Sequence, residues 1–346
     1  MKKFRLLIPM AALLFTTVLP ARASVSAPLE GVPHFGNVFV VIGENTELVQ
    51  INHNSMPYLL DTLGPQSAFL DKFYGVTHFS TGNYVGMTSG QYTPCEQFDK
   101  KPAECHQDIN NIFNQLTGVG ASWTAWNESM PEPCYLVNSG GTKTLNSYAV
   151  KHNPAVYYDN IEGAGGVWSA TNRSALCMNN VIPTGGTGPN DTSALDSALA
   201  SGNVSDFNYI VPNMCEDSHD QCPGSPGAPI HQFDDFLARE VPKILASPAF
   251  GSDGVLIVTF DEGTSTTGGS PSSGSTPCQA WVTCPHPFNG GGNVAFLVIS
   301  PLANAGVIYH DRADLYSMLR TLEDGFGIST YLGAAGSARP INEIWK

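Results

Sequence analysis

Four short polar clusters contain the side chains of this sequence that could carry out chemistry. The clusters are Glu44-Asn45, Ser80 to Asn83, Asp217 to Asp220 and Asp261-Glu262. Their carboxylate and amide oxygens are hard ligands, which favour Mg²⁺, Ca²⁺ or Mn²⁺, although zinc and iron also accept carboxylates. A serine hydroxyl is a weak nucleophile at neutral pH and needs a base or a metal ion to activate it. We therefore expect a divalent cation beside Ser80. Its expected ligands are Glu44, Asn45, Asp261 and Glu262.

Two of the clusters directly follow strand-like runs. Residues 38–42 (VFVVI) lead through Gly43 into Glu44, and residues 255–260 (VLIVTF) lead into Asp261. Continuous apolar runs of this length are typical of buried central strands. Ligands of open α/β sheets bind beyond the carboxyl ends of the strands, which is where both acidic pairs would lie. The alternative is that each acidic residue only caps a turn or a helix.

The serine cluster precedes a predicted helix. Residues 84–90 (YVGMTSG) could form a short helix closed by Gly90, which places Ser80 at or next to the N-cap. Exposed N–H groups and the positive end of the helix dipole would receive a phosphate bound there. The alternative is that Ser80 only caps the helix.

A histidine lies near the end of another predicted strand. Asp217 and His219 follow residues 209–212 (YIVP), so the imidazole could lie at the same edge of the sheet. A protonated histidine would suit both phosphate binding and protonation of a leaving alkoxide.

These clusters and further motifs resemble the secreted bacterial and fungal acid phosphatases of the phosphoesterase family. That family also contains bacterial phospholipases C and belongs to the alkaline phosphatase superfamily. The resemblance runs from about Gly36 to Trp345. In the family's order, the matching motifs are Glu44-Asn45 with 56–59 (MPYL), 78–84 (HFSTGNY), 126–131 (WNESMP), 151–154 (KHNP), 211–220 (VPNMCEDSHD), 259–263 (TFDEG) and 319–324 (LRTLED).

The resemblance implies a role for each matching site residue. It implies that Ser80 is a nucleophile that also touches the metal ion. The implied metal ligands are Glu44, Asn45, Asp261 and Glu262, and the implied lining of the phosphate pocket is Asn83, His152, Asp217 and His219.

The sequence departs from the family pattern at three positions. Phe79 and Gly82 replace the usual prolines around the serine, which could loosen the turn that aims Ser80. Leu315 stands where the family has a histidine, so that role is either absent or taken by His310.

The N-terminus predicts export. Three basic residues precede the apolar stretch 6–19, and residues 21–23 (ARA) offer a cleavage site, so residues 1–23 read as a signal peptide of a secreted or periplasmic protein. No other stretch is long enough to span a bilayer, so no stable membrane anchor is expected. The formal net charge is −14, and removing residues 1–23 with their four basic side chains leaves −18. Such an acidic surface disfavours binding to nucleic acid and to anionic membranes.

All eight cysteines lie after residue 23, and an even number in an exported protein predicts disulfides. Short spacings favour three pairs and leave the fourth by elimination. The predicted pairs are Cys95–Cys105, Cys215–Cys222, Cys278–Cys284 and Cys134–Cys177. The alternative is a thiolate zinc site, which is disfavoured because the sequence contains no Cys-x-x-Cys pair.

Strands and helices alternate along the chain, which predicts an α/β fold. We expect a central, mostly parallel sheet with helices on both faces, in one domain over residues 24–346. The family resemblance implies that this fold is like that of alkaline phosphatase. The predicted strands are 38–42, 207–212, 255–260 and 294–299, and the predicted helices are 55–63, 108–116, 231–245 and 313–326. Residues 263–292 are rich in Gly and Ser, which favours a surface loop or a lid over the site, with Trp281 and Phe288 as substrate contacts.

Together these features predict a secreted, metal-dependent acid phosphatase that works through a phosphoserine intermediate. Its substrate would be a small-molecule or lipid-headgroup phosphate ester. One alternative is a phosphodiesterase similar to phospholipase C, and another is an exported binding protein that keeps the fold without the chemistry. A serine esterase is disfavoured because the sequence has no Gly-x-Ser-x-Gly elbow.

Overall fold

In the part of the chain that the structure describes, a nine-stranded β-sheet forms the centre, in the order β4-β3-β5-β1-β6-β7-β2-β8, with β9 paired to β2. The computed structural model describes residues 28–91, 98–141, 143–224, 227–264 and 290–346. The strands are β1 (Val38–Gly43), β2 (Ala68–Tyr74), β3 (Trp123–Asn127), β4 (Val181–Pro183), β5 (Phe207–Val211), β6 (Val255–Phe260), β7 (Asn293–Ile299), β8 (Val307–Tyr309) and β9 (Ala313–Asp314).

Most neighbouring strands are parallel. β1 pairs in parallel with β5 on one side and with β6 on the other, whereas β7 runs antiparallel to both β6 and β2. The central strands β1, β5 and β6 are buried along their whole length, as expected for parallel strands covered on both faces. The predicted mostly parallel sheet is therefore confirmed, and so are the four strands predicted from apolar runs.

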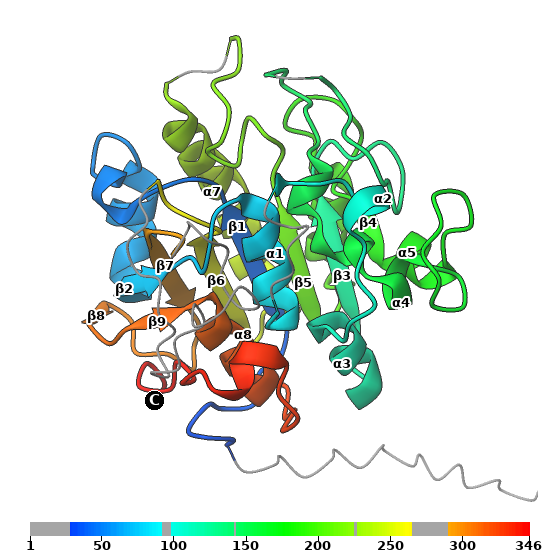
Figure 1. Cartoon of the computed structure of the whole chain (residues 1–346). Coiled ribbons are helices and arrows are strands. Elements are labelled where there is room, and N and C mark those ends of the chain that lie inside the picture. The colour runs from blue at the N-terminus through cyan, green and yellow to red at the C-terminus, as the bar shows by residue number, and fades with distance from the viewer. Residues whose placement is uncertain (1–27, 92–97, 142, 225–226, 265–289) are drawn as a thin grey trace, which may run out of the picture.

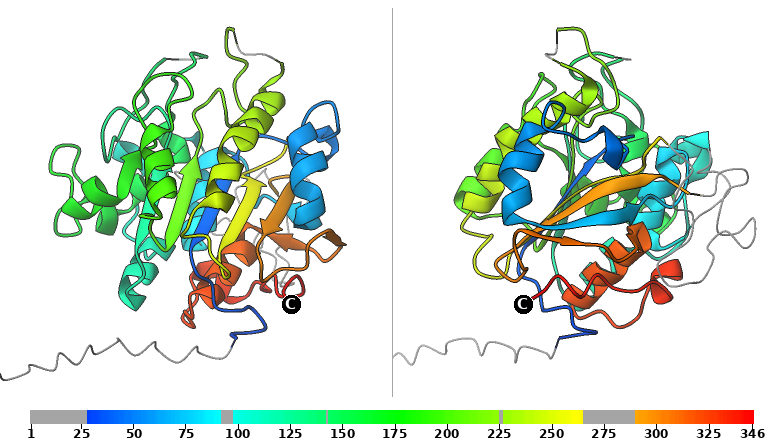
Figure 2. Two further views of the ribbon diagram at one scale, coloured as in Figure 1. Left: turned by 180° about the vertical axis from the view of Figure 1, so that it is seen from behind. Right: turned by 90° about the vertical axis from the view of Figure 1, so that its left-hand side faces the viewer.

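Helices cover both faces of the sheet. Figure 1 shows α1 and α8 in front of it, and Figure 2 shows α7 on the opposite face. The α-helices are α1 (Ser80–Ser89), α2 (Pro102–Cys105), α3 (Ile112–Val119), α4 (Asp159–Glu162), α5 (Ala175–Asn180), α6 (Ser193–Ser201), α7 (Pro229–Ala246) and α8 (Leu315–Gly325). Shorter helical turns are η1 (Leu48–Gln50), η2 (Tyr58–Leu63), η3 (Gly64–Gln66), η5 (Val150–His152), η6 (Pro154–Tyr157) and η7 (Gly333–Gly336).

Helix α1 differs from its prediction at its N-terminal end. It begins at Ser80 rather than at residue 84, with Phe79 as the N-cap, and Gly90 ends it in the left-handed conformation at φ 67°. Residues 80–83 are poor helix formers, yet the side chain of Asp99 accepts hydrogen bonds from the N–H and hydroxyl of Thr81. This contact supplies the cap that the local sequence lacks. Ser80 is therefore the first helical residue.

Three further predicted helices exist with shifted ends. Residues 55–63 contain η2, residues 108–116 overlap α3, and residues 231–245 lie within α7. The helix predicted from residue 313 begins at Leu315, because residues 313–314 pair with β2 and Asp314 caps α8 through the N–H groups of Tyr316 and Ser317.

Two of the predicted disulfides are present. Cys134 is bonded to Cys177, and Cys215 is bonded to Cys222. Cys105 is also disulfide-bonded, but its predicted partner Cys95 lies outside the described residues. The predicted pair Cys278–Cys284, the signal peptide and most of the 263–292 loop lie outside them as well. Within the described ranges, no helix is both long and apolar enough to cross a membrane.

Candidate active site

The acidic pairs after β1 and β6 lie side by side. Gly43 pairs with Phe260 at the ends of the two parallel strands, so Glu44 and Asp261 follow at the same level. The N–H of Asn45 donates to Asp261 Oδ1 at 3.2 Å. Glu44, Asp261 and Glu262 are all buried. The predicted convergence of the two acidic pairs at one edge of the sheet is thus present.

The hydroxyl of Ser80 points at these carboxylates. Ser80 Oγ donates to Glu44 Oε2 at 3.0 Å and lies 3.4 Å from Glu262 Oε1. The loop from β2 to α1 passes close to the residue that follows β6, and at this point of closest approach only glycine fits, at Gly75. A Cβ at Gly75 would lie 2.8 Å from the carbonyl oxygen of Asp261. Ser80 itself is 1% exposed, so its hydroxyl is held within the site.

His152 lies between two of the carboxylates. Its Nε2 is 3.1 Å from Glu44 Oε1, and its Nδ1 is 3.2 Å from Asp217 Oδ2, although neither contact has hydrogen-bond geometry. The ring stacks on Tyr84 of α1 with centroids 5.2 Å apart. Burial, together with the charge of Lys151, lowers the pKa of His152 well below its usual range. His152 is therefore neutral at pH 7 in this arrangement.

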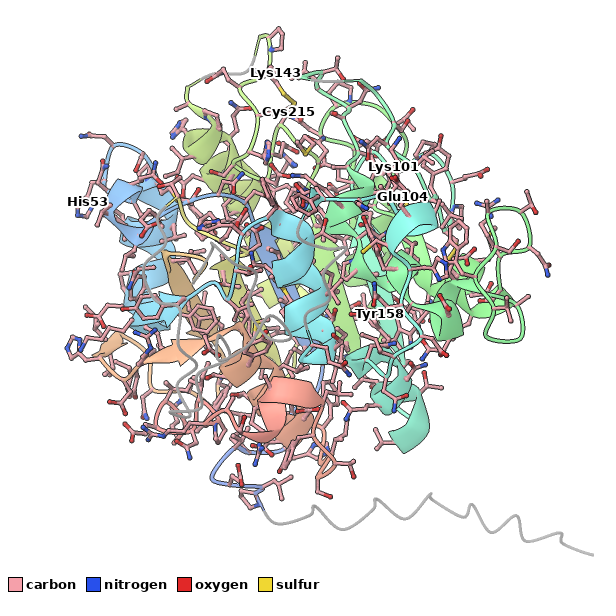
Figure 3. The ribbon with its side chains drawn as sticks, viewed as in Figure 1. His53, Lys101, Glu104, Lys143, Tyr158 and Cys215 are labelled. Atoms are coloured by element: carbon pink, nitrogen blue, oxygen red, sulfur yellow. A yellow bond between two sulfur atoms is a disulfide. The ribbon has the colours of Figure 1, made fainter. Side chains whose placement is uncertain are left out.

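Asp217 and His219 lie in the loop after β5. The N–H of Glu44 donates to the carbonyl of Asp217, which ties this loop to the end of β1. His219 is partly exposed, its Nδ1 is 3.0 Å from Asp220 Oδ1, and its ring centroid is 6.0 Å from that of His152. Figure 3 shows Cys215, in the same loop, at the upper end of the molecule. The Cys215–Cys222 disulfide encloses both Asp217 and His219.

Asn83 uses its amide to hold the chain before Ser80. Its Oδ1 accepts from the N–H groups of Val76 and Thr77, and its Nδ2 donates to Thr77 O and to Glu262 Oε2. The sequence predicted a phosphate contact for this buried residue. In the structure, its hydrogen bonds fix the turn that leads into α1.

Three further residues, to which the sequence analysis gave no role, also lie at the site. Lys151 Nζ lies 3.5 Å from Ser80 Oγ and 3.1 Å from Asp99 Oδ2, and His78 Nδ1 lies 2.5 Å from Glu262 Oε2. Burial lowers the pKa of Lys151, but the charges of Glu44 and Asp99 outweigh it and raise that pKa above its usual value. The sequence signal for Lys151 and His78 was their place in the motifs 151–154 (KHNP) and 78–84 (HFSTGNY). Nothing in the sequence pointed to Asp99.

His310 lies apart from this cluster. It is on the surface, where its Nδ1 contacts Asp71 Oδ2 at 2.7 Å, and Leu315 is buried at the start of α8. The structure thus gives His310 a surface ion-pair partner rather than a place beside Ser80.

Several buried polar atoms at the site have no hydrogen-bond partner. They are Glu44 Oε1, Asp217 Oδ2, Asp261 Oδ2, His152 Nε2 and the hydroxyl of Tyr84. Burial, followed by the charge of Glu44, raises the pKa of both Asp217 and Asp261 well above the usual range. Burial and mutual repulsion make it costly to keep these carboxylates charged, and a bound cation would offset that cost. Carboxylate oxygens are suitable ligands for such a cation. Among the described residues, however, no three His, Cys, Asp or Glu side chains already stand as a metal-binding group. The donor types, carboxylate and amide oxygens, fit a divalent ion.

Two acid phosphatases are similar to this chain in sequence. A probable acid phosphatase from Kluyveromyces lactis is 26% identical over 255 residues, covering 69% of this chain and 50% of that protein. An acid phosphatase from Aspergillus fumigatus is 26% identical over 204 residues, covering 58% of this chain and 39% of that protein. The chain thus spans half or less of the length of these two relatives.

The fold has counterparts among solved structures. A protein of the alkaline phosphatase superfamily from Vibrio parahaemolyticus superposes with a TM-score of 0.54 at 12% identity, over 92% of this chain and 72% of that one. The Phosphoesterase family matches residues 37–329, a span that includes every predicted site residue. With most of its sequence matched in this way, the chain belongs to the Phosphoesterase family and has the fold of the alkaline phosphatase superfamily.

Proposed function

We propose that the protein is an exported phosphoric ester hydrolase that cleaves phosphate monoesters with Ser80 as the nucleophile. One observation carries this proposal: the first residue of α1 directs its hydroxyl at carboxylates delivered by β1 and β6, 3.0 Å from Glu44 Oε2. The family membership and the two acid phosphatase relatives support the same reaction class. Two disulfides and the leader-like N-terminus support export.

A divalent ion is part of the proposal. Glu44, Asn45, Asp261 and Glu262 would hold it, with Ser80 Oγ as a further ligand, and Mg²⁺, Ca²⁺ or Mn²⁺ suits these donors best, with zinc and iron as alternatives. Such an ion lowers the pKa of a bound hydroxyl and neutralises charge on phosphate oxygens. The unpartnered oxygens of Glu44 and Asp261 support this assignment, because a buried carboxylate oxygen without a partner is costly.

The residues of the chain position the reactants. Ser80 Oγ attacks phosphorus and forms a phosphoserine, while the bond from phosphorus to the ester oxygen breaks and that oxygen keeps the electron pair. Glu44 Oε2 already accepts the hydroxyl hydrogen bond of Ser80 and is placed to receive its proton. Lys151 and the N-terminal end of α1 lie beside Oγ, where negative charge develops on the phosphoryl oxygens.

The leaving oxygen needs a proton, and His219 is the residue we assign to supply it. Its Nδ1 lies 3.0 Å from Asp220 Oδ1, a contact that orients the ring. Water then attacks the phosphoserine, and the same groups act in reverse to release phosphate and restore Ser80. We assign His152 and Asp217 to the lining of the phosphate site, because the His152 ring lies 3.1 Å from Glu44 and 3.2 Å from Asp217.

Hydrolysis of the mono- and bis-p-nitrophenyl phosphates by the mature protein tests the proposal. We expect turnover of the monoester, loss of that turnover on chelation and recovery with one added ion. Ser80→Ala should lower kcat by roughly 10³-fold or more, because it removes the nucleophile. Ser89→Ala is the matched control, since Ser89 is also a buried serine of α1 but donates only to the carbonyl of Val85.

Other outcomes would favour the alternatives. Faster turnover of the diester would support a phosphodiesterase similar to phospholipase C. Equal turnover by Ser80→Ala and Ser89→Ala would exclude Ser80 as the nucleophile. No hydrolysis of either ester with any divalent ion would leave the exported binding protein as the better description.

A further inference from the structure

Two exposed phenylalanines lie side by side next to the site. Phe79 is 39% exposed and Phe98 is 63% exposed, and their ring centroids are 6.4 Å apart at an interplanar angle of 39°. Each directly precedes a residue of the site, because Phe79 is followed by Ser80 and Phe98 by Asp99. Single exposed apolar residues are common on protein surfaces, but a pair of exposed aromatic rings beside a reactive group is typical of a binding surface.

Hydrogen bonds to Asp99 fix the position of this pair relative to the nucleophile. Asp99 Oδ1 accepts from the N–H of Thr81 at 3.0 Å and from its hydroxyl at 2.9 Å, and Asp99 Oδ2 accepts from Lys151 Nζ at 3.1 Å. The segment that carries Phe98 is therefore attached to the first turn of α1, and Phe79 is the N-cap residue of that helix. Both rings are thus tied to the same turn that holds Ser80.

The charged and apolar parts of a phosphate ester would occupy different parts of this region. The phosphoryl oxygens need Lys151 and the N–H groups of α1, since these groups stabilise negative charge. The phenylalanine rings offer no hydrogen bonds and can contact only the carbon part of the ester. Aromatic rings bind other flat rings in offset or tilted contacts, with a gain beyond simple apolar burial.

We propose that Phe79 and Phe98 bind the leaving group, and that the preferred substrates are phosphate monoesters with an aromatic group. The assignment rests on the proposed phosphomonoesterase activity and deepens it. A competing surface for the leaving group is a hollow of about 310 Å³ that Lys151 helps to line. Its lining includes Asn138, Tyr148, Lys151, Met214 and Asp220, a mixture of polar and apolar groups that would also accept a polyol.

The test compares two alkyl phosphates whose leaving groups have similar basicity, 2-phenylethyl phosphate and glycerol 2-phosphate. For the mature protein we expect kcat/KM to be higher for the phenylethyl ester. In Phe98→Ala the ratio of the two kcat/KM values should fall about tenfold, mainly through KM. Phe98→Leu keeps most of the apolar volume and should give a smaller fall, which keeps the test informative if the alanine variant folds poorly.

Ile308→Ala is the matched control, because Ile308 is 57% exposed but lies on β8, in another part of the sheet. It should leave the ratio unchanged. A wild-type preference for glycerol 2-phosphate would overturn the assignment in favour of the hollow that Lys151 lines. An unchanged ratio in both Phe98 variants would overturn it as well. Either result would leave the phosphomonoesterase standing, whereas no hydrolysis of either ester would overturn the proposed function and this assignment together.

Discussion

Lys151 Nζ lies 3.5 Å from Ser80 Oγ and 3.1 Å from Asp99 Oδ2, so a partly buried ammonium group stands between the nucleophile and an acidic residue. The same Asp99 carboxylate accepts two hydrogen bonds from Thr81, in the first turn of α1. Asp99 therefore holds the lysine and the start of the helix in a fixed relationship. An ammonium group held in this way needs little reorganisation when charge develops beside it.

Replacing Lys151 should impair chemistry more than folding. In Lys151→Met we expect kcat to fall by about 10²- to 10³-fold, the usual cost of removing one fixed group that stabilises transition-state charge. Lys243→Met is the control, because Lys243 forms an ion pair with Asp196 between α6 and α7, away from Ser80. Steady-state kinetics on a monoester would measure both. A change confined to KM would show that Lys151 only binds substrate.

Asp99→Asn separates the two roles of Asp99. Asn tolerates the positive φ of 50° at this position and can still accept from Thr81, so the helix should begin normally. The ion pair with Lys151 is lost, and we expect a smaller loss of kcat than in Lys151→Met. A larger loss would mean that Asp99 itself acts in the reaction.

The site was partly predictable because its acidic residues follow strong local signals. Glu44 and Asp261 come directly after apolar runs, and the parallel register of β1 and β6 brings them together. Lys151 and Asp99 gave no such signal, because their partners are distant in the chain: Lys151 is 71 residues from Ser80 and 52 residues from Asp99. Their roles come from tertiary contacts, which a single sequence does not contain.

Strand β2 was not predicted from the sequence, and the reason is again structural. β2 (AFLDKFY) carries Asp71 and Lys72 at its centre, and its pairing with β7 shifts register between Leu70 and Phe73. That irregularity interrupts the alternation of apolar and polar residues that identifies a strand. The N-terminal end of α1 was missed because its cap comes from Asp99, 18 residues further along the chain.

A divalent ion should stabilise the protein through the carboxylate cluster. At a concentration about 100-fold above its Kd, an ion that binds only the folded state adds about 2.7 kcal/mol, which should raise Tm by several degrees. Thermal unfolding after chelation, with single ions then added back, measures this without any turnover. In Asp261→Asn the rise should be largely lost, because a ligand charge is removed.

Asp253→Asn is the control for the ion experiment. Asp253 is exposed and lies just before β6, at the opposite end of the strand from Asp261, so its variant should keep the full rise in Tm. Equal stabilisation of Asp261→Asn and Asp253→Asn would place the ion somewhere else. No stabilisation of the wild-type protein by any ion would argue against a resident metal.

The free energy of unfolding should fall as pH rises, in part because of two buried acids of α8. Burial raises the pKa of Glu323 to about 7 and that of Asp324 to about 6. Between the usual pKa near 4 and these values, the folded state holds protons that the unfolded state has released. Their stabilising contribution is therefore full at acid pH and is lost as pH rises through about 7.

Urea unfolding at pH 5 and pH 8 would measure this loss, and Glu323→Gln should reduce it by about 1–3 kcal/mol. The amide keeps an acceptor for the N–H of Leu332, which donates to Glu323 Oε1 at 2.8 Å, but it cannot ionise. Glu343→Gln removes an exposed carboxylate and should leave the pH dependence unchanged. If Glu323→Gln lost as much stability between pH 5 and pH 8 as the wild-type protein, the buried acid would not be the titrating group. A confirmed loss would mean that this buried acid makes the fold more stable at pH 5 than at pH 8.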